Sequence, residues 1–160
     1  MRPEDFAAQT QTPIGPGTMR DLLHIRICDA WVHAQDIRRA VKRPGDLEGS
    51  VAAHAVGRVA MAMPYVVGRK VRPADGTTVV FAMPGATGRT VALRMEEGRA
   101  KGLDEIPVTP TVRLTMDAET LTCLGCGRWT PEAVLKAGKV QITGDTALGQ
   151  TILGQMNIMI

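Results

Sequence analysis

A carboxylate and an imidazole lie four residues apart near the middle of the segment from Thr18 to Val41. These residues are Asp29 and His33. Because residues four apart share one face of a helix, both side chains could reach the same ion or proton. Apolar residues flank this face, and burying two polar groups among them costs free energy unless a partner satisfies them. The pair therefore indicates either an ion or proton site, or a satisfied pair that joins the helix to its neighbours.

Two cysteines form a second pattern that could do chemistry, the C-x-x-C of Cys123 and Cys126. Such a pair can be a redox centre or half of a metal site. The sequence has no second C-x-x-C, and this one falls late in a predicted helix, away from the N-terminus that would stabilise a thiolate. We therefore expect two buried thiols that pack like small apolar residues.

The segment that carries Asp29 and His33 has the start and stop signals of a helix. Thr18 and Asp21 fit a capping box, and Pro44-Gly45 is a strong stop. The apolar residues between them fall on two faces, which is typical of a helix packed on two sides. We expect an inner helix of a bundle, or a strut between two units.

The pattern after this helix predicts an α+β fold. A second helix is expected from about Ser50 to Val67, ended or kinked at Pro64, followed by a basic loop at residues 68–76. From Thr77 onward the apolar period changes from 3.6 to 2, which predicts strands in a mostly antiparallel sheet with one covered face. The expected strands are at residues 77–83, 89–95, 100–103, 111–116 and 140–142, and the later helices are at 117–126, 130–138 and from Gly144-Asp145 to Ile160.

The composition restricts the classes of function. A chain of 160 residues that is 44% hydrophobic and 22% charged suits one domain, or a small domain with a helical extension. Three cysteines, no long apolar run and no signal peptide predict a cytoplasmic protein without a membrane span. The net charge of +3 is scattered and only 3% of residues are aromatic, which argues against binding to nucleic acid.

Two parts of the sequence resemble one family. The run from Trp31 to Ala40, WVHAQDIRRA, looks like the last helix of the metal-binding bundle in mycothiol-dependent maleylpyruvate isomerase-like proteins, which have a DinB-like four-helix fold. The chain from about Thr77 onward resembles their C-terminal domain, which is similar to sterol-carrier proteins. Residues 114–120 and 144–149 carry that likeness. The resemblance implies a loop and the last bundle helix at 1–45, and a sterol-carrier-like α+β domain with its connecting helix at 46–160.

The resemblance also implies zinc and mycothiol as cofactors. In this family a divalent metal, typically zinc, is held by a His on an earlier helix and by a Glu and a His four apart on the last helix, and it activates the thiol of mycothiol. His33 matches the family histidine, and Asp29 stands in the carboxylate position, one methylene shorter than Glu. Asp36 is a candidate acceptor for the other ring N–H of His33. The third ligand and the other bundle helices would have to come from a second copy, a partner chain or an upstream segment.

Two functions are compatible with these features. The first is the C-terminal portion of a metal- and mycothiol-dependent isomerase or transferase, which adds a thiol to a small unsaturated acid or a related electrophile. The alternative is a non-catalytic module that binds an apolar small molecule or lipid, or a domain that docks on a partner enzyme. Flexible methionines would suit the wall of an apolar pocket, although they could equally be core. The candidate pocket residues are Met83, Met95, Met116 and Met156.

Overall fold

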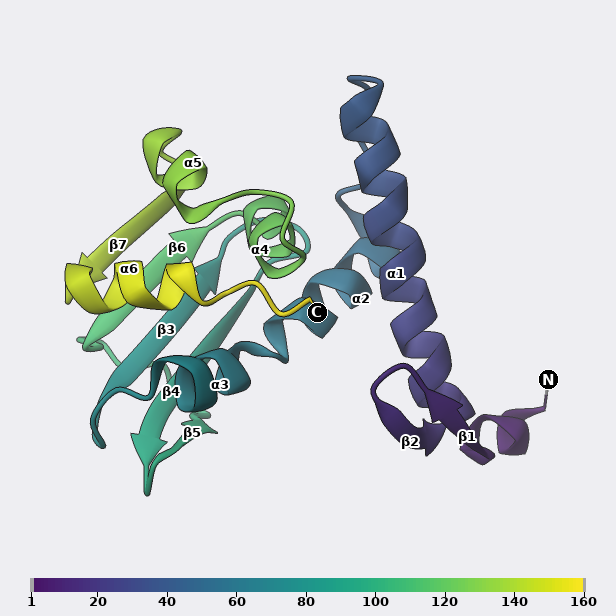
Figure 1. The fold of residues 1–160 in the computed structure, drawn as a ribbon, viewed down its shortest axis with the longest axis horizontal. Helices are drawn as coiled ribbons and strands as arrows, with labels where there is room; N and C mark the ends of the chain where they lie inside the picture. Colours follow the sequence, from purple (N-terminus) through teal and green to yellow (C-terminus); the bar gives the residue numbers. More distant parts are fainter. Residues whose placement is uncertain (1, 160) are drawn as a thin grey trace.

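The computed structural model describes residues 2–159. A 3-10 turn, η1 (Pro3–Ala7), and a hairpin of β1 (Gln9–Thr12) and β2 (Gly15–Thr18) precede the long helix α1 (Met19–Ala40). Helix α2 (Gly49–Ala60), the short α3 (Met63–Tyr65) and a π-helical stretch, η2 (Val66–Val71), follow. Figure 1 shows α1 and the hairpin at one end of the molecule and the sheet at the other, with α2 between them.

Within residues 2–159, five strands form the main sheet in the order β5-β4-β3-β6-β7. The central strand β3 pairs parallel with β6, and the other neighbouring strands pair antiparallel. The predicted α+β fold with a mostly antiparallel sheet is therefore confirmed. The strands are β3 (Thr78–Met83), β4 (Arg89–Glu96), β5 (Arg99–Gly102), β6 (Val112–Met116) and β7 (Val140–Gly144).

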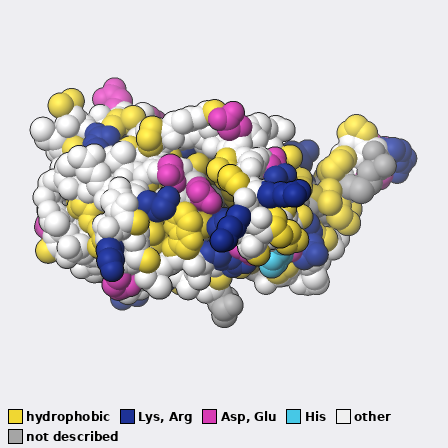
Figure 2. Space-filling model, turned by 90° about the horizontal axis from the view of Figure 1, so that it is seen from above, with side chains coloured by type: hydrophobic (Ala, Val, Ile, Leu, Met, Phe, Trp, Pro, Cys, Tyr) yellow, Lys and Arg dark blue, Asp and Glu magenta, His cyan; other side chains and the backbone are white. Residues whose placement is uncertain are grey.

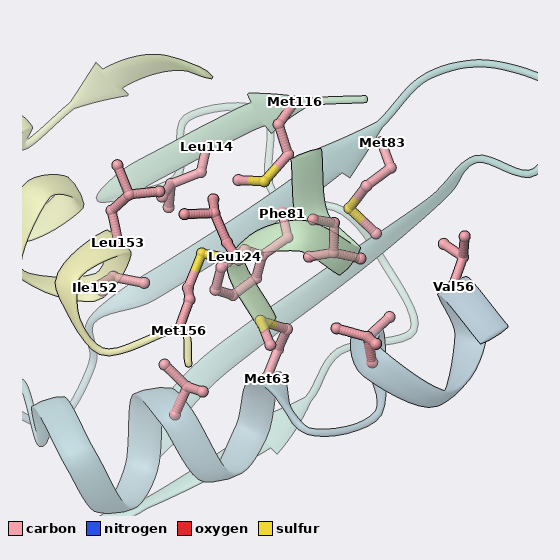
Figure 3. Close-up of a cluster of buried hydrophobic side chains, with 14 of the residues drawn as sticks. Val56, Met63, Phe81, Met83, Leu114, Met116, Leu124, Ile152, Leu153 and Met156 are labelled. Atoms are coloured by element: carbon pink, nitrogen blue, oxygen red, sulfur yellow. The ribbon is translucent and has the colours of Figure 1, made fainter. Parts of the chain in front are cut away.

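One face of this sheet is apolar across its width because the strand register aligns apolar side chains. Phe81 on β3 lies opposite Val91 on β4 and Leu114 on β6, and Leu114 lies opposite Ile142 on β7. Since side chains alternate along a strand, these residues and their second neighbours share one face. Helices α3, α4 (Ala118–Gly125) and α6 (Thr146–Gly154) cover that face, and α5 (Pro131–Lys136) lies at its edge. Figure 3 shows Leu124 close to Phe81, and Leu153 of α6 beside Leu114.

The predicted helix starts agree with the structure. The Thr18 hydroxyl accepts a hydrogen bond from the Asp21 backbone N–H at 3.2 Å, and the Asp21 carboxylate accepts one from the Thr18 N–H at 2.8 Å. Asp117, Thr130 and Asp145 cap α4, α5 and α6 in the same manner. Such caps satisfy backbone N–H groups that have no partner in the first helical turn.

Three helix boundaries differ from the sequence prediction. The second helix breaks at Met61-Ala62, and Pro64 lies in the first turn of α3, where its missing N–H costs nothing. The chain then stays helical to Val71, where a basic loop was expected, because residues 66–68 are buried in the core. The last helix ends at Gly154, so Met156 follows it, and Ile160 lies outside the described residues.

The stretch Gly49–Val71 is long and apolar enough, by length and composition alone, to cross a membrane. More than half of its most apolar window is buried inside this fold, where it joins α1 to the sheet. The expected lack of a membrane span and the cytoplasmic location remain predictions.

Close packing of α2 on α4 depends on a missing side chain. A Cβ atom at Gly125, in the last turn of α4, would lie 2.5 Å from Cγ1 of Val59 on α2. Both residues are buried. The facing part of α2 is rich in small residues, among them Ala52, Ala55 and Ala60. The two helices can approach closely only because these positions carry little or no side chain.

We expect Gly125→Ala to lower the free energy of unfolding by about 1–3 kcal/mol, because the added methyl group overpacks the contact with Val59. Urea unfolding followed by circular dichroism measures this difference. Gly154→Ala is the matched control, since a Cβ atom there meets nothing within 4 Å. An equal loss of stability in both variants would contradict the packing argument.

Candidate functional site

Asp29 and His33 lie on the outward side of α1. Nε2 of His33 is 3.4 Å from Oδ1 of Asp29, and Oδ2 of Asp29 is 3.1 Å from Nη1 of Arg26. The side chain of His33 is 64% exposed and that of Asp29 is 37% exposed. Burial therefore imposes little desolvation cost on this pair, and the geometry corresponds to a surface ion-pair cluster.

Asp36 joins α1 to the segment that follows α4. Its carboxylate accepts hydrogen bonds from Nη2 of Arg39 at 2.7 Å and from Nη2 of Arg128 at 2.8 Å. Its distance to Nδ1 of His33 is 3.6 Å, which is too long for a hydrogen bond. The hydrogen bond from Arg128, followed by that from Arg39, holds the pKa of Asp36 below its ordinary value. Asp36 therefore stabilises the contact between α1 and the sheet domain, and it is not hydrogen-bonded to His33.

The residues around His33 do not complete a three-ligand zinc site within one chain. No group of three His, Cys, Asp or Glu side chains among residues 2–159 could hold a metal ion. His24 and His54 contact each other instead, with ring centroids 4.8 Å apart, and Nε2 of His54 lies 3.0 Å from the His24 carbonyl oxygen. Because a catalytic zinc usually takes three protein ligands, the other bundle elements would be needed. The zinc and mycothiol assignments, and the domain boundary at residue 45, remain predictions.

Polar contacts fix the C-terminal half of α1 against the rest of the chain. Nε1 of Trp31 donates to the carbonyl oxygen of Asp46 at 2.9 Å, and Nε2 of Gln35 donates to the same oxygen at 3.1 Å. Nη1 of Arg39 reaches Glu119 on α4 at 3.4 Å. A hollow of about 10 Å³, enough for one water molecule, lies among these groups. Trp31 and Gln35 are both buried, so this side of α1 is a packed surface.

We expect Asp36→Asn to lower the free energy of unfolding by about 1–2 kcal/mol at pH 7, because both arginines lose a charged acceptor. The folded-state pKa of Asp36 lies below its ordinary value of 3.8, so its contribution is complete above that value. It is lost as the pH falls from about 4 through the lowered folded-state pKa, so the gap between the two proteins should narrow below about pH 4 and close only below that pKa. Urea unfolding at several pH values measures the gap.

The matched control is Asp29→Asn, which removes an exposed pair on the same helix. Exposed ion pairs contribute about 1 kcal/mol or less, so a smaller loss is expected at pH 7. A gap for Asp36→Asn that persists unchanged to pH 2, or that equals the gap for Asp29→Asn, would show that the arginine contacts do not stabilise the fold.

The two cysteines of the C-x-x-C are both buried. Desolvation by burial raises the pKa of Cys123 to about 12 and that of Cys126 to about 11. Both thiols therefore stay protonated near neutral pH, and a thiolate nucleophile or metal ligand is disfavoured. They pack as small apolar residues beside the hollow under α1.

A larger hollow, of about 260 Å³, lies between the end of α4, the turn that follows it and the end of α6. Most of its lining is apolar, and Thr130 and Asn157 supply polar atoms. The lining residues are Leu124, Gly127, Trp129, Thr130, Pro131, Leu153, Gly154 and Asn157. An apolar hollow with a few polar groups is the usual form of a small-molecule site.

Backbone geometry and the C-terminal segment build the walls of this hollow. Gly127 ends α4 with a φ of +68°, and a Cβ atom there would lie 3.0 Å from Nδ2 of Asn157. Nζ of Lys70 donates to the carbonyl oxygens of Gln155 at 2.8 Å and Asn157 at 2.7 Å. The Ile158 N–H donates to the Gly125 carbonyl oxygen at 2.9 Å. The segment after α6 is thus held against the turn after α4.

The four methionines proposed from the sequence as pocket residues are packed in the core. Met83, Met95, Met116 and Met156 are all buried, and neither hollow described above is lined by them. Figure 3 shows Met83, Met116 and Met156 among side chains of the sheet and helices. The sequence feature that could have indicated the larger hollow is Trp129, in a turn between Gly127 and Pro131. Rigid aromatic residues in surface loops often mark binding sites.

Residues 66–155 match the model of the SCP-2 sterol transfer family. This match covers more than half of the chain, and the chain therefore belongs to that family. The matched segment runs from η2 to just beyond α6 and includes every lining residue of the larger hollow except Asn157. The predicted sterol-carrier-like domain is confirmed, whereas the match does not extend to the helix that resembles a mycothiol-dependent isomerase.

Several solved structures are similar in fold. The second sterol carrier protein domain of Helicoverpa armigera is 18% identical, covers 73% of this chain and 95% of its own, and has a TM-score of 0.48. Sterol carrier protein 2 like 2 of Aedes aegypti is 17% identical over 61% of this chain and 89% of its own, with a TM-score of 0.45. The sec-alkylsulfatase Pisa1 of Pseudomonas sp. is 13% identical over 88% of this chain and 30% of its own, with a TM-score of 0.48. No curated protein matches the chain.

Proposed function

We propose that this chain binds an apolar small molecule that has a single hydrocarbon chain, in the hollow between α4 and α6. The observation that carries the proposal is an apolar hollow of about 260 Å³ inside the domain that matches the sterol transfer family. Ligand pockets usually measure about 300–1,000 Å³, so this one suits a slender ligand. Packing of a hydrocarbon chain against its walls would remove methylene groups from water, and each buried methylene group contributes about 0.8 kcal/mol.

Two polar side chains at the hollow favour a ligand with an oxygen-bearing head group. The Thr130 hydroxyl oxygen accepts the N–H of Ala133 at 3.2 Å, which leaves its O–H to donate. The side-chain oxygen Oδ1 of Asn157 accepts the N–H of Met159 at 3.0 Å, which leaves the side-chain NH₂ of Asn157 to donate. A carboxylate or carbonyl group accepts from such donors, so a simple carboxylic acid is a suitable probe.

The isomerase or transferase hypothesis depends on residues 31–40, which lie outside the matched segment. Binding without catalysis is supported by both the hollow and the family, so it takes precedence here. The docking of the domain on a partner enzyme remains compatible with ligand binding.

The binding site can be tested with 11-bromoundecanoic acid, since a bromine atom quenches a tryptophan only at short range. The chain has two tryptophans, Trp31 on α1 and Trp129 in the wall of the hollow. We expect the acid to quench the tryptophan emission of the Trp31→Phe variant, which retains Trp129. The emission of the Trp129→Phe variant, which retains Trp31, should stay nearly unchanged. Affinity for unbranched acids should rise roughly fourfold per added methylene until the hollow is full.

Two results would contradict this proposal. One is equal quenching of both variants, which would place the ligand elsewhere or indicate nonspecific association. The other is saturable binding whose affinity is independent of chain length, because burial of the hydrocarbon could not then be the driving force.

A further inference from the structure

The outward face of α1 carries an apolar seam that the rest of the described chain leaves in solvent. Its larger members are substantially exposed: Ile27 is 41%, Val41 57% and Ile37 65% exposed. The seam residues follow one another at alternating steps of four and three, the heptad spacing of a coiled coil. They are Leu23, Ile27, Ala30, Ala34, Ile37 and Val41.

No residue of the seam is buried in the described chain, although Leu23 and Ala34 are half-buried. The buried residues of α1 are Trp31, which borders the seam, and Val32 and Gln35, which lie further round the helix. Figure 2 looks down on the C-terminal end of α1 and shows Lys and Arg side chains close to hydrophobic ones in that part of the molecule. An exposed apolar seam of this regularity on a folded helix indicates a helical partner.

We propose that a second copy of this chain covers the seam, with the two α1 helices antiparallel and related by a two-fold axis at the level of Val32. A two-fold interface requires a surface complementary to itself. About this centre the large residues oppose large ones and the alanines oppose alanines. The opposed pairs are Leu23 with the partner's Val41, Ile27 with the partner's Ile37, and Ala30 with the partner's Ala34.

The helix dipoles, more than the charges beside the seam, favour the antiparallel arrangement. Arg26 and His33 border one edge of the seam, and Asp29 lies one position further out on that edge. In the antiparallel register, His33 comes within about 3 Å along the axis of the partner's Asp29 and equally near the partner's His33, since each residue rises 1.5 Å. A parallel pair would also match residue sizes, but it would place His33 beside the partner's Arg38. Like charges therefore meet in both arrangements, and the antiparallel dipoles decide between them.

The size of the seam predicts a dimer that dissociates in the micromolar range. From Leu23 to Val41 the seam is about 27 Å long, which places the interface near the lower end of specific protein contacts. Contacts with Asp46 and Glu119 already hold α1 in the single chain, so dimer formation does not bear the free-energy cost of forming the helix. The central alanines allow the two helix backbones to approach closely.

Sedimentation equilibrium of the intact chain tests the proposal. The chain has a mass of 17.1 kDa, and the weight-average mass should rise toward twice this value as the concentration increases through the micromolar range. Ile37→Glu should stay at the single-chain mass with unchanged circular dichroism. Val108→Glu is the control, because Val108 is 95% exposed on a loop away from the seam, and it should behave as the unsubstituted chain.

Cross-linking tests the register. In the antiparallel pair, position 27 faces the partner's position 37, so a mixture of Ile27→Cys and Ile37→Cys chains should form a disulfide dimer under mild oxidation. Each variant alone, and the unsubstituted chain with its own cysteines, should form far less. Cross-linking of the single variants alone would overturn the antiparallel register. A single-chain mass at every concentration would overturn the dimer and leave the seam to another protein or to a segment outside this chain.

Discussion

The structure depends on burying one face of the five-stranded sheet away from water. The register that aligns Val91, Phe81, Leu114 and Ile142 makes that face continuous, so a cover of helices is required along its whole width. The chain supplies the cover from several places in the sequence, with α3 and η2 before the strands, α4 between β6 and β7, and α6 after β7. Gly149 lets α6 approach Ile142 on β7, and Gly125 lets α4 approach Val59 on α2, because neither glycine carries a side chain.

The larger hollow follows from how this cover is completed. Helix α4 ends at a left-handed glycine, the chain turns through Trp129 and Pro131, and α6 ends soon after Leu153. The segment beyond α6 then returns to α4 and is held there by Lys70 and the Gly125 carbonyl oxygen. Helix ends that meet over a sheet leave a space whose walls are apolar and whose polar atoms come from the turn and the returning segment. The binding hypothesis therefore arises from the same constraint as the fold.

The sequence predicted the helix caps, the strands of the five-stranded sheet and its covered face because those features are encoded locally, by caps such as Asp117 and by alternation such as that around Leu93. It expected a loop where β1 and β2 form a hairpin. It missed the helical continuation through Gly68, because burial against β5 outweighs the loop-like composition of that stretch. It offered the methionines either as pocket candidates or as core, and they lie in the core, whereas the hollow is lined by residues brought together from α4, the following turn and α6. Tertiary packing decides which residues line such a hollow, and the spacing of residues in one sequence does not reveal it. Asp29 and His33 were predicted to share a face, and they do, but their exposure could not be known without the rest of the fold.

The central claim is that an apolar ligand occupies the hollow between α4 and α6. Amide chemical shifts of the isotope-labelled chain during titration with an unbranched carboxylic acid test it most directly. The account predicts saturable shifts centred on Leu124, Gly127, Thr130 and Leu153, with little change along α1. Shifts centred on residues 29–36, or an absence of saturable shifts around the hollow, would contradict it.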